Sequence, residues 1–169
     1  MVRSGITRPT RRYYEQDVSI IYVTIIRPLK NCIFTLETAF WDKRLGIKTL
    51  GVQRREAPIG DANRDAEVYQ SKSYYSIRKC LRPVEMGPED VFYDVGCGAG
   101  RVLCLVAQTR IRKCVGVELS PALCKLARQN ARNLRGRRTA IEIVEGDAAL
   151  ADYSDRSVFL LQSFRSQDP

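Results

Sequence analysis

The feature that most constrains the fold is a regular alternation of apolar segments from residue 91 onward. Four segments have the composition of buried β-strands, and helical patterns separate the first three of them. The predicted strands are 91–96, 113–119, 139–147 and 157–164, and the predicted helices are 101–110 and 122–136. Strands that alternate with helices pair in parallel through right-handed crossovers. The sequence therefore predicts an α/β fold with a doubly wound, mostly parallel sheet.

The second of these helices carries clear start and stop signals. Ser120 is a good N-cap, Pro121 suits the first helical position, and Gly136 follows the last periodic residue. Its predicted apolar face consists of Leu123, Leu126, Ala127, Ala131 and Leu134. Cys104 and Cys124 also fall at apolar helix positions, so we expect both thiols in the core.

Glycines occupy every second position directly after the first predicted strand, at Gly96, Gly98 and Gly100. In doubly wound sheets, ligands bind beyond the carboxyl ends of the strands, next to such a first turn. The dinucleotide fingerprint Gly-x-Gly-x-x-Gly would place the third glycine one residue later. The tighter spacing leaves two interpretations at this stage, a nucleotide-like ligand held against bare backbone or a tight turn without a ligand.

Three acidic residues lie where successive predicted strands end, namely Asp94, Glu118 and Asp147. Each has a purely structural alternative: Asp94 could brace the glycine loop, Glu118 could start a helix, and Asp147 could cap the turn that follows it. A carboxylate is an acceptor that takes two donors, which suits a pair of ribose hydroxyls. Three such groups beside one crevice favour ligand binding over three separate structural roles.

The run "GPEDVFYDVGCGAGRVLCLVA", followed by "VGVELSPAL", resembles class I S-adenosylmethionine (SAM)-dependent methyltransferases over about residues 69–164. It is most similar to a subgroup that includes protein lysine methyltransferases and uncharacterised bacterial enzymes. The resemblance implies that Glu118 binds the ribose hydroxyls, Asp147 the adenine amino group and Asp94 the methionine ammonium. The cofactor-binding residues that it implies are Tyr69, Asp94, Gly96, Cys97, Gly98, Gly100, Glu118, Leu119, Asp147 and Ala148.

The acceptor side is less defined. The resemblance places a segment with Tyr69 and Ser71 over the methionine end, while packing against the sheet is the expected role of Tyr74 or Tyr75. Relatives carry an Asn-Pro pair at the end of the fourth strand, where it holds the acceptor nitrogen. This chain lacks the pair, so methylation of nucleobases or of glutamine is disfavoured. Gln162 stands there instead and is the candidate substrate-lining residue. No catalytic residue is assigned, because in-line methyl transfer depends mostly on positioning. The methyl acceptor is unidentified, with protein lysine preferred on resemblance alone.

Three other functions stay open. A SAM-binding remnant or regulatory module without catalysis is the main alternative, followed by a nicotinamide-dependent oxidoreductase and an RNA-binding module. The class I fold continues with further strands, and a crossover unit needs about thirty residues, more than follow the fourth predicted strand here. We therefore expect either a C-terminally truncated chain, or a sheet edge that a partner chain or a second copy covers.

The first part of the chain differs in composition. Residues 1–60 carry 11 basic and 5 acidic side chains, so we predict a basic extension and linker at 1–68 and a partial SAM-binding domain at 69–169. Nucleic acid is a conceivable partner of this extension, although no binding motif accompanies it.

The apolar run 18–26 is too short to span a bilayer and is expected to be a buried strand or helix. Further helices are predicted from Asn31 to Gly46 and from about Ser73 to Pro83, the latter with Ile77, Cys80 and Leu81 on one face.

Composition excludes several kinds of chemistry. The 169 residues contain no histidine, so neither a Ser-His-Asp or Cys-His nucleophile nor a histidine-containing metal site can form. The six cysteines form no CxxC pair, so they are expected to be reduced thiols and not zinc ligands. A cytoplasmic location, without a transmembrane segment, is the corresponding expectation.

Overall fold

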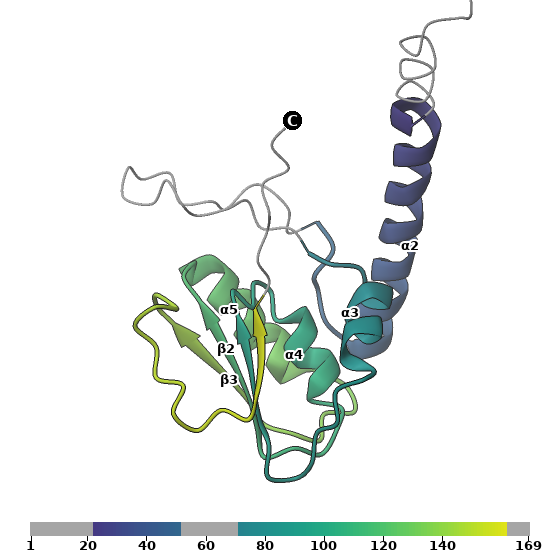
Figure 1. Ribbon diagram of the computed structural model, residues 1–169. Coiled ribbons are helices and arrows are strands. Elements are labelled where there is room, and N and C mark those ends of the chain that lie inside the picture. The colour runs from purple at the N-terminus through teal and green to yellow at the C-terminus, as the bar shows by residue number, and fades with distance from the viewer. Residues whose placement is uncertain (1–21, 52–70, 162–169) are drawn as a thin grey trace, which may run out of the picture. The chain divides into compact units, whose positions relative to one another are not determined.

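The computed structural model describes residues 22–51 and 71–161 (Figure 1). The chain divides into two compact units, residues 1–36 and 37–169. The predicted boundary at residue 68 falls outside the described residues and stays a prediction, as do the expected roles of Tyr69 and Gln162.

The second unit is built on a four-stranded parallel sheet, which confirms the predicted α/β class. Its strands are β1 (Val91–Val95), β2 (Lys113–Glu118), β3 (Ile141–Glu145) and β4 (Val158–Leu161), in the order β3-β2-β1-β4. In the register of the sheet, Asp94 of β1 lies opposite Gly116 of β2, and Glu118 lies opposite Glu145 of β3. The carboxyl ends of β1, β2 and β3 therefore meet at one edge.

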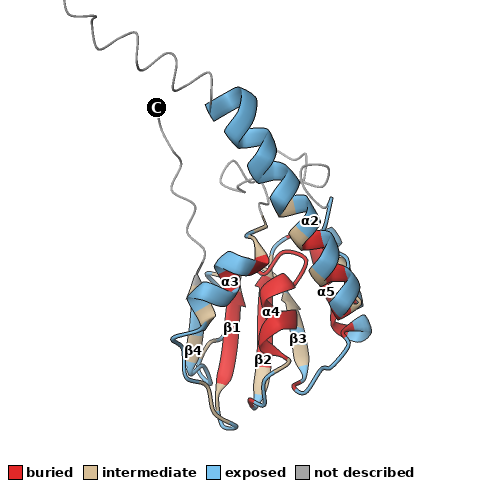
Figure 2. Ribbon diagram, turned by 90° about the vertical axis from the view of Figure 1, so that its right-hand side faces the viewer, coloured by how far each residue is buried: buried red, intermediate tan, exposed pale blue. Residues whose placement is uncertain are grey.

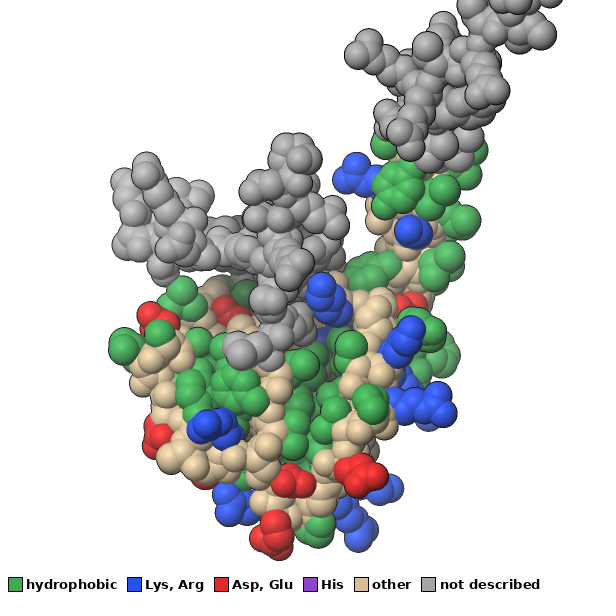
Figure 3. All heavy atoms as spheres, in the orientation of Figure 1, with side chains coloured by type: hydrophobic (Ala, Val, Ile, Leu, Met, Phe, Trp, Pro, Cys, Tyr) green, Lys and Arg blue, Asp and Glu red, His purple; other side chains and the backbone are tan. Residues whose placement is uncertain are grey.

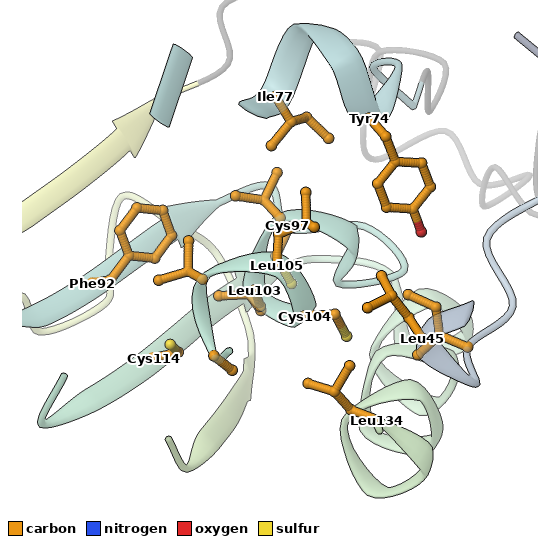
Figure 4. Close-up of a cluster of buried hydrophobic side chains, with 14 of the residues drawn as sticks. Leu45, Tyr74, Ile77, Phe92, Cys97, Leu103, Cys104, Leu105, Cys114 and Leu134 are labelled. Atoms are coloured by element: carbon orange, nitrogen blue, oxygen red, sulfur yellow. The ribbon is translucent and has the colours of Figure 1, made fainter. Parts of the chain in front are cut away.

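One face of the sheet is covered by the helices α3 (Tyr74–Leu81), α4 (Arg101–Val106) and α5 (Pro121–Asn133) (Figure 2). Every residue of α4 is buried. The larger apolar cluster joins Phe92 and Cys114 of the strands to side chains of these helices, including Leu103 and Cys104 (Figure 4). Burying a side chain such as Leu103 contributes about 1.5–3 kcal/mol. Cys104 and Cys124 are both buried, as predicted.

The other face is covered by the connection between β3 and β4. Side chains of alternate strand residues, Tyr93 and Val115 among them, point to this face and form a second, smaller cluster. Tyr153 of the connection packs edge-on against Tyr93, with the ring centroids 5.3 Å apart. The Tyr93 hydroxyl donates a hydrogen bond to Asp155 at 2.7 Å, which fastens the connection to the sheet.

The helix at the N-terminal end of the described chain begins earlier than predicted. A π-helical turn, η1 (Tyr22–Ile26), leads directly into α2 (Arg27–Leu45), so Asn31 is an interior residue and not the N-cap. Pro28 is therefore also an interior residue of this continuous helical segment, where its ring takes one backbone N–H out of the hydrogen-bond pattern. The helix ends before Gly46, as expected, and Gly46 has a left-handed backbone with φ of 75°.

The expectation that the apolar run 18–26 is buried is wrong for its described part, because all of Tyr22–Ile26 is exposed. Apolar side chains also reach the surface along α2 (Figure 3). Among the helices that the structure describes, none is long and apolar enough to cross a membrane.

The predicted starts of two further helices are confirmed. The hydroxyl of Ser73 accepts a hydrogen bond from the backbone N–H of Ser76 at 3.1 Å, which caps α3. The hydroxyl of Ser120 accepts one from the N–H of Leu123 at 3.4 Å, and Pro121 is the first residue of α5. Of the residues predicted to share one face of α3, Ile77 is buried, whereas Cys80, three residues further on, is exposed.

Candidate functional site

The glycine loop, residues 96–100, joins β1 to α4 at the carboxyl edge of the sheet. Gly96, Gly98 and Gly100 all have left-handed backbones, with φ of 71°, 54° and 77°, which residues with a Cβ rarely adopt. The N–H groups of Gly96 and Cys97 both donate to the carbonyl of Val117, at 2.9 and 3.1 Å. The loop is therefore fastened to the end of β2 by its own backbone.

Glu118 ends β2 and connects the glycine loop to the start of α5. Its Oε2 accepts a hydrogen bond from the N–H of Gly98 at 2.8 Å, and its Oε1 accepts one from the N–H of Ser120 at 3.0 Å. The helix-start role that the sequence left open is thus part of what Glu118 does. A carboxylate has about four acceptor sites, so two hydrogen bonds leave capacity for further donors.

Asp94 lies on β1 just before the loop and is almost completely buried, with 1% of its surface exposed. Burial, with a smaller contribution from the negative charge of Glu118, raises the pKa of Asp94 to about 8. Its Oδ1 has no hydrogen-bond partner among the described residues. Buried polar atoms are usually paired in native proteins, so this atom is suited to receive a donor from a ligand.

Asp147 follows β3 and is exposed. Its Oδ1 accepts a hydrogen bond from the N–H of Ala149 at 2.8 Å, so the turn-bracing alternative is observed. The N–H of Gly146 donates to the carbonyl of Glu118 at 3.0 Å, which joins this turn to the end of β2. Leu119, 43% exposed, and the half-buried Ala148 add apolar surface to the same strand ends.

The structure thus brings most of the predicted cofactor residues to one edge of the sheet. The residues that share this edge are Asp94, Gly96, Cys97, Gly98, Gly100, Glu118, Leu119, Asp147 and Ala148. Tyr69 and Gln162 lie outside the described residues. Tyr74 or Tyr75 was expected to pack against the sheet. Tyr74 is buried and stacks on Trp41 of α2, with the ring centroids 5.8 Å apart, while Tyr75 is exposed.

A buried polar network behind the glycine loop was missed by the sequence analysis. Arg101, the first residue of α4, is 3% exposed and donates to the hydroxyl of Thr49 from Nε at 2.8 Å and from Nη2 at 2.6 Å. Its Nη1 donates to the carbonyl of Lys72 at 2.6 Å. One guanidinium therefore joins the loop after α2 and the segment before α3 to the helix that follows the glycines.

Asp42 of α2 completes this network. Its carboxylate accepts hydrogen bonds from the hydroxyls of Thr49 at 2.7 Å and Tyr74 at 2.6 Å, and from the N–H of Leu50 at 2.9 Å. Burial and this carboxylate both raise the pKa of Tyr74, so it stays a neutral donor. Two sequence signals were available, the arginine directly after Gly100 and the aspartate near the end of α2. Neither signal indicates which residues these side chains bind.

The loop itself is also held from α5. The side-chain amide of Asn130 donates to the carbonyl of Ala99 at 2.9 Å and exchanges hydrogen bonds with the backbone of Lys48, at 2.8 Å and 3.0 Å.

Burial raises the pKa of the Cys97 thiol, so this cysteine is not a thiolate nucleophile. Within the described residues, no group of three His, Cys, Asp or Glu side chains could hold a metal ion. The site can therefore bind a polar ligand through acceptors and backbone, and it lacks an obvious covalent catalyst.

Solved structures similar to this chain include methyltransferases. An RNA methyltransferase from Salinibacter ruber, in complex with S-adenosyl-L-homocysteine, is 33% identical with a TM-score of 0.48, over 53% of this chain and 58% of that one. A SAM-dependent methyltransferase from Thiobacillus denitrificans, also in complex with S-adenosyl-L-homocysteine, is 22% identical with a TM-score of 0.38, over 46% of this chain and 31% of that one.

Two curated relatives are lysine methyltransferases. A protein-lysine N-methyltransferase of Saccharolobus islandicus (strain REY15A) is 30% identical over 83 residues, which are 48% of this chain and 51% of that protein. A histone-lysine N-methyltransferase of Caenorhabditis elegans, specific for H3 lysine-79, is 36% identical over 56 residues, 32% of this chain and 6% of that protein. The chain thus spans about half the length of the first relative and a small part of the second.

The sequence model of the family described as histone methylation protein DOT1 matches residues 62–157. The match covers more than half of the 169 residues and contains β1, β2, β3, the glycine loop and all three helices of the covered face. The chain belongs to the DOT1 family of methyltransferases.

Proposed function

We propose that this chain binds SAM at the carboxyl edge of its sheet and transfers the methyl group to a lysine side chain of a protein. One observation carries the proposal: the left-handed glycine loop lies between two carboxylates, Asp94 and Glu118, and one oxygen of Asp94 has no partner among the described residues. Membership in the DOT1 family and the lysine specificity of the curated relatives support both the cofactor and the acceptor.

The residues at this edge fit the cofactor. Glu118, with acceptor capacity beyond its two backbone amides, would bind the ribose hydroxyls. Asp94 would pair with the methionine ammonium and lose its proton on doing so, because a nearby positive charge favours the ionised carboxylate. Leu119 and Ala148 would lie against the adenine, and Asp147 would accept from its amino group. Tyr69 is proposed to cover the methionine end.

The chemistry demands little covalent help from the protein. Bound SAM would supply a methyl group on a positively charged sulfur. An uncharged lysine amine would attack the methyl carbon in line with the C–S bond, and that bond would break to leave neutral S-adenosyl-L-homocysteine and a methylated ammonium group. The chain's own contribution is to hold the reacting groups in place and exclude water, a role that the anchored loop and the buried Arg101 network can serve. No described residue is assigned as a general base.

Calorimetric titration of the chain with SAM and with S-adenosyl-L-homocysteine, using the Glu118→Gln variant, tests this proposal. We expect the parent to bind with micromolar affinity and the variant to bind at least about tenfold more weakly, or about 1.4 kcal/mol, since an amide cannot accept from two hydroxyls and two amides at once. Glu145→Gln is the matched control, because Glu145 ends the neighbouring strand and pairs with Arg128. A folded parent that releases no heat with either ligand would contradict the proposal.

The acceptor requires a second experiment. The chain is incubated with SAM carrying a radioactive methyl group and either a mixture of proteins or RNA, and the modified residues or nucleotides are identified by mass spectrometry. Methyl-lysine is the expected product. Tight SAM binding without transfer to any protein would instead support a cofactor-binding module without catalysis, and methylated RNA would replace lysine as the acceptor.

A further inference from the structure

Three segments of the second unit bring six basic side chains to one surface, which we call the arginine surface. It consists of Lys43, Arg110, Arg132, Arg135, Arg137 and Arg138, all exposed. These residues come from the end of α2, the turn after α4, and the end of α5 with the turn that follows it. The segments lie far apart in the sequence, so the surface exists only in the folded chain.

Hydrogen bonds fix these segments to one another. The backbone N–H of Arg135 donates to the carbonyl of Leu45 at 2.8 Å, and its Nη1 donates to the carbonyl of Lys43 at 3.2 Å. The N–H of Arg138 donates to the carbonyl of Ala107 at 2.8 Å. The side chain of Gln108 donates to the carbonyl of Arg135 at 3.4 Å. Arg135 therefore lies between the two other segments.

The charge of this surface is not balanced. Residues 43–49, 107–112 and 132–140 contain no Asp or Glu at all. The ion pairs within the described part of the chain involve Arg112, Lys113 and Arg128, and none of the six residues of the arginine surface. Cations held together without counter-ions attract a polyanion and raise its local concentration.

The kind of side chain indicates which polyanion fits. Five of the six residues are arginines, whose planar guanidinium groups bind phosphate through two parallel hydrogen bonds. The large exposed apolar residues of the described chain all lie outside residues 43–49, 107–112 and 132–140. Binding to a membrane surface or to a protein partner usually relies on such apolar anchors, whereas a phosphate backbone needs only charge and hydrogen-bond donors.

We propose that the arginine surface binds the phosphate backbone of double-stranded nucleic acid. The arginine surface lies at the edge of the sheet where the parallel strands begin, next to the end of α5 and the start of β2. The candidate SAM site lies at the opposite edge, where the strands end, so both sites can be occupied at once. The proposal does not depend on methyltransferase activity. A chain without cofactor can still bind a duplex through these residues.

Fluorescence anisotropy of a labelled 24-base-pair DNA duplex and of the matching RNA duplex, at several KCl concentrations, measures this binding. The test variant is Arg110→Gln/Arg132→Gln/Arg138→Gln, because these side chains make no hydrogen bond or ion pair with described residues. The matched control is Lys79→Gln/Arg82→Gln/Lys125→Gln, which removes the same charge from exposed positions of α3, its C-cap and α5.

Each phosphate contact contributes about 0.9 to the slope of log affinity against log salt on B-form DNA. We expect the test variant to lower that slope by about 3 and to weaken binding at least about tenfold at low salt, while the control changes it little. Equal losses in the two variants would overturn the proposal, because binding would then follow net charge alone. Binding of anionic phosphatidylserine vesicles or polyglutamate, with no binding of either duplex, would overturn it as well.

Discussion

Asp94 shows how one buried residue ties stability to ligand binding. The carboxyl group is almost fully buried, its Oδ1 is unpartnered among the described residues, and its pKa is raised to about 8. At neutral pH the acid is therefore mostly protonated in the folded chain. An unpaired buried group of this kind is unfavourable for folding and is best explained by a role in binding.

The raised pKa predicts a pH-dependent stability. The folded state holds the proton of Asp94 up to about pH 8, and the unfolded state loses it near pH 4, so the free energy of unfolding falls as pH rises between these values. The slope is about 1.4 kcal/mol per pH unit from this group alone, and it vanishes below and above that range. The Asp94→Asn variant has no carboxyl group at this position, so its free energy of unfolding should lack this contribution to the pH dependence.

Urea unfolding of the parent and of Asp94→Asn at pH 5, 7 and 9 measures this effect. The variant is expected to gain stability relative to the parent as pH increases. Parallel pH profiles for the two proteins would show that Asp94 titrates normally in the folded chain.

At the scale of elements, the close packing of α4 on β2 depends on Gly116. A Cβ at this position would lie 2.5 Å from Cδ1 of Leu103 and 2.6 Å from Sγ of Cys97, closer than real Cβ contacts allow. The glycine thus permits both α4 and the glycine loop to approach the strand. Its role is close packing, and its backbone is that of an ordinary strand residue.

Gly116→Ala is therefore expected to destabilise the chain by about 1–3 kcal/mol, the usual cost of overpacking a core. The same substitution at Gly146, where nothing lies within 4 Å of an added Cβ, should have little effect. Thermal unfolding of the two variants checks the difference. Similar melting temperatures would mean that the core relaxes around the added methyl group.

For the whole molecule, the boundary between the two units falls within α2. No described residue before position 37 is buried, whereas the part of α2 after it contributes Thr38, Asp42 and Leu45 to the interior. The loop that follows supplies Thr49, the partner of Arg101 and Asp42. Residues 37–51 are thus integral to the sheet-containing unit.

This division predicts the outcome of two truncations. A fragment of residues 37–169 is expected to keep the melting temperature and the SAM affinity of the full chain. A fragment of residues 52–169 leaves the buried Arg101 without Thr49 and is expected to lose about 3–5 kcal/mol, the typical cost of removing one side of a buried charged network. Circular dichroism and calorimetry on both fragments measure this. Equal stability of the two fragments would show that residues 37–51 are not required.

Several features followed from the sequence alone because their causes are local. The alternation of strand and helix patterns predicted the parallel sheet, since each element depends on its own periodicity. Ser120 and Pro121 predicted the start of α5, and the glycines predicted a turn with bare backbone directly after β1. The acids at the strand ends were found because parallel strands end at one edge.

Other features were decided only by the tertiary structure. Thr49 and Arg101 are 52 residues apart in the chain, and Asp42 and Tyr74 are 32 apart, so no local pattern could pair them. The early start of the helical segment was missed because a proline disfavours a helix interior, whereas the structure continues the helix from η1 through Pro28 into α2. The pKa of Asp94 and the unbalanced charge of the arginine surface depend on burial and on the meeting of distant segments, because electrostatic energies are set by distance and solvent exposure in the folded chain.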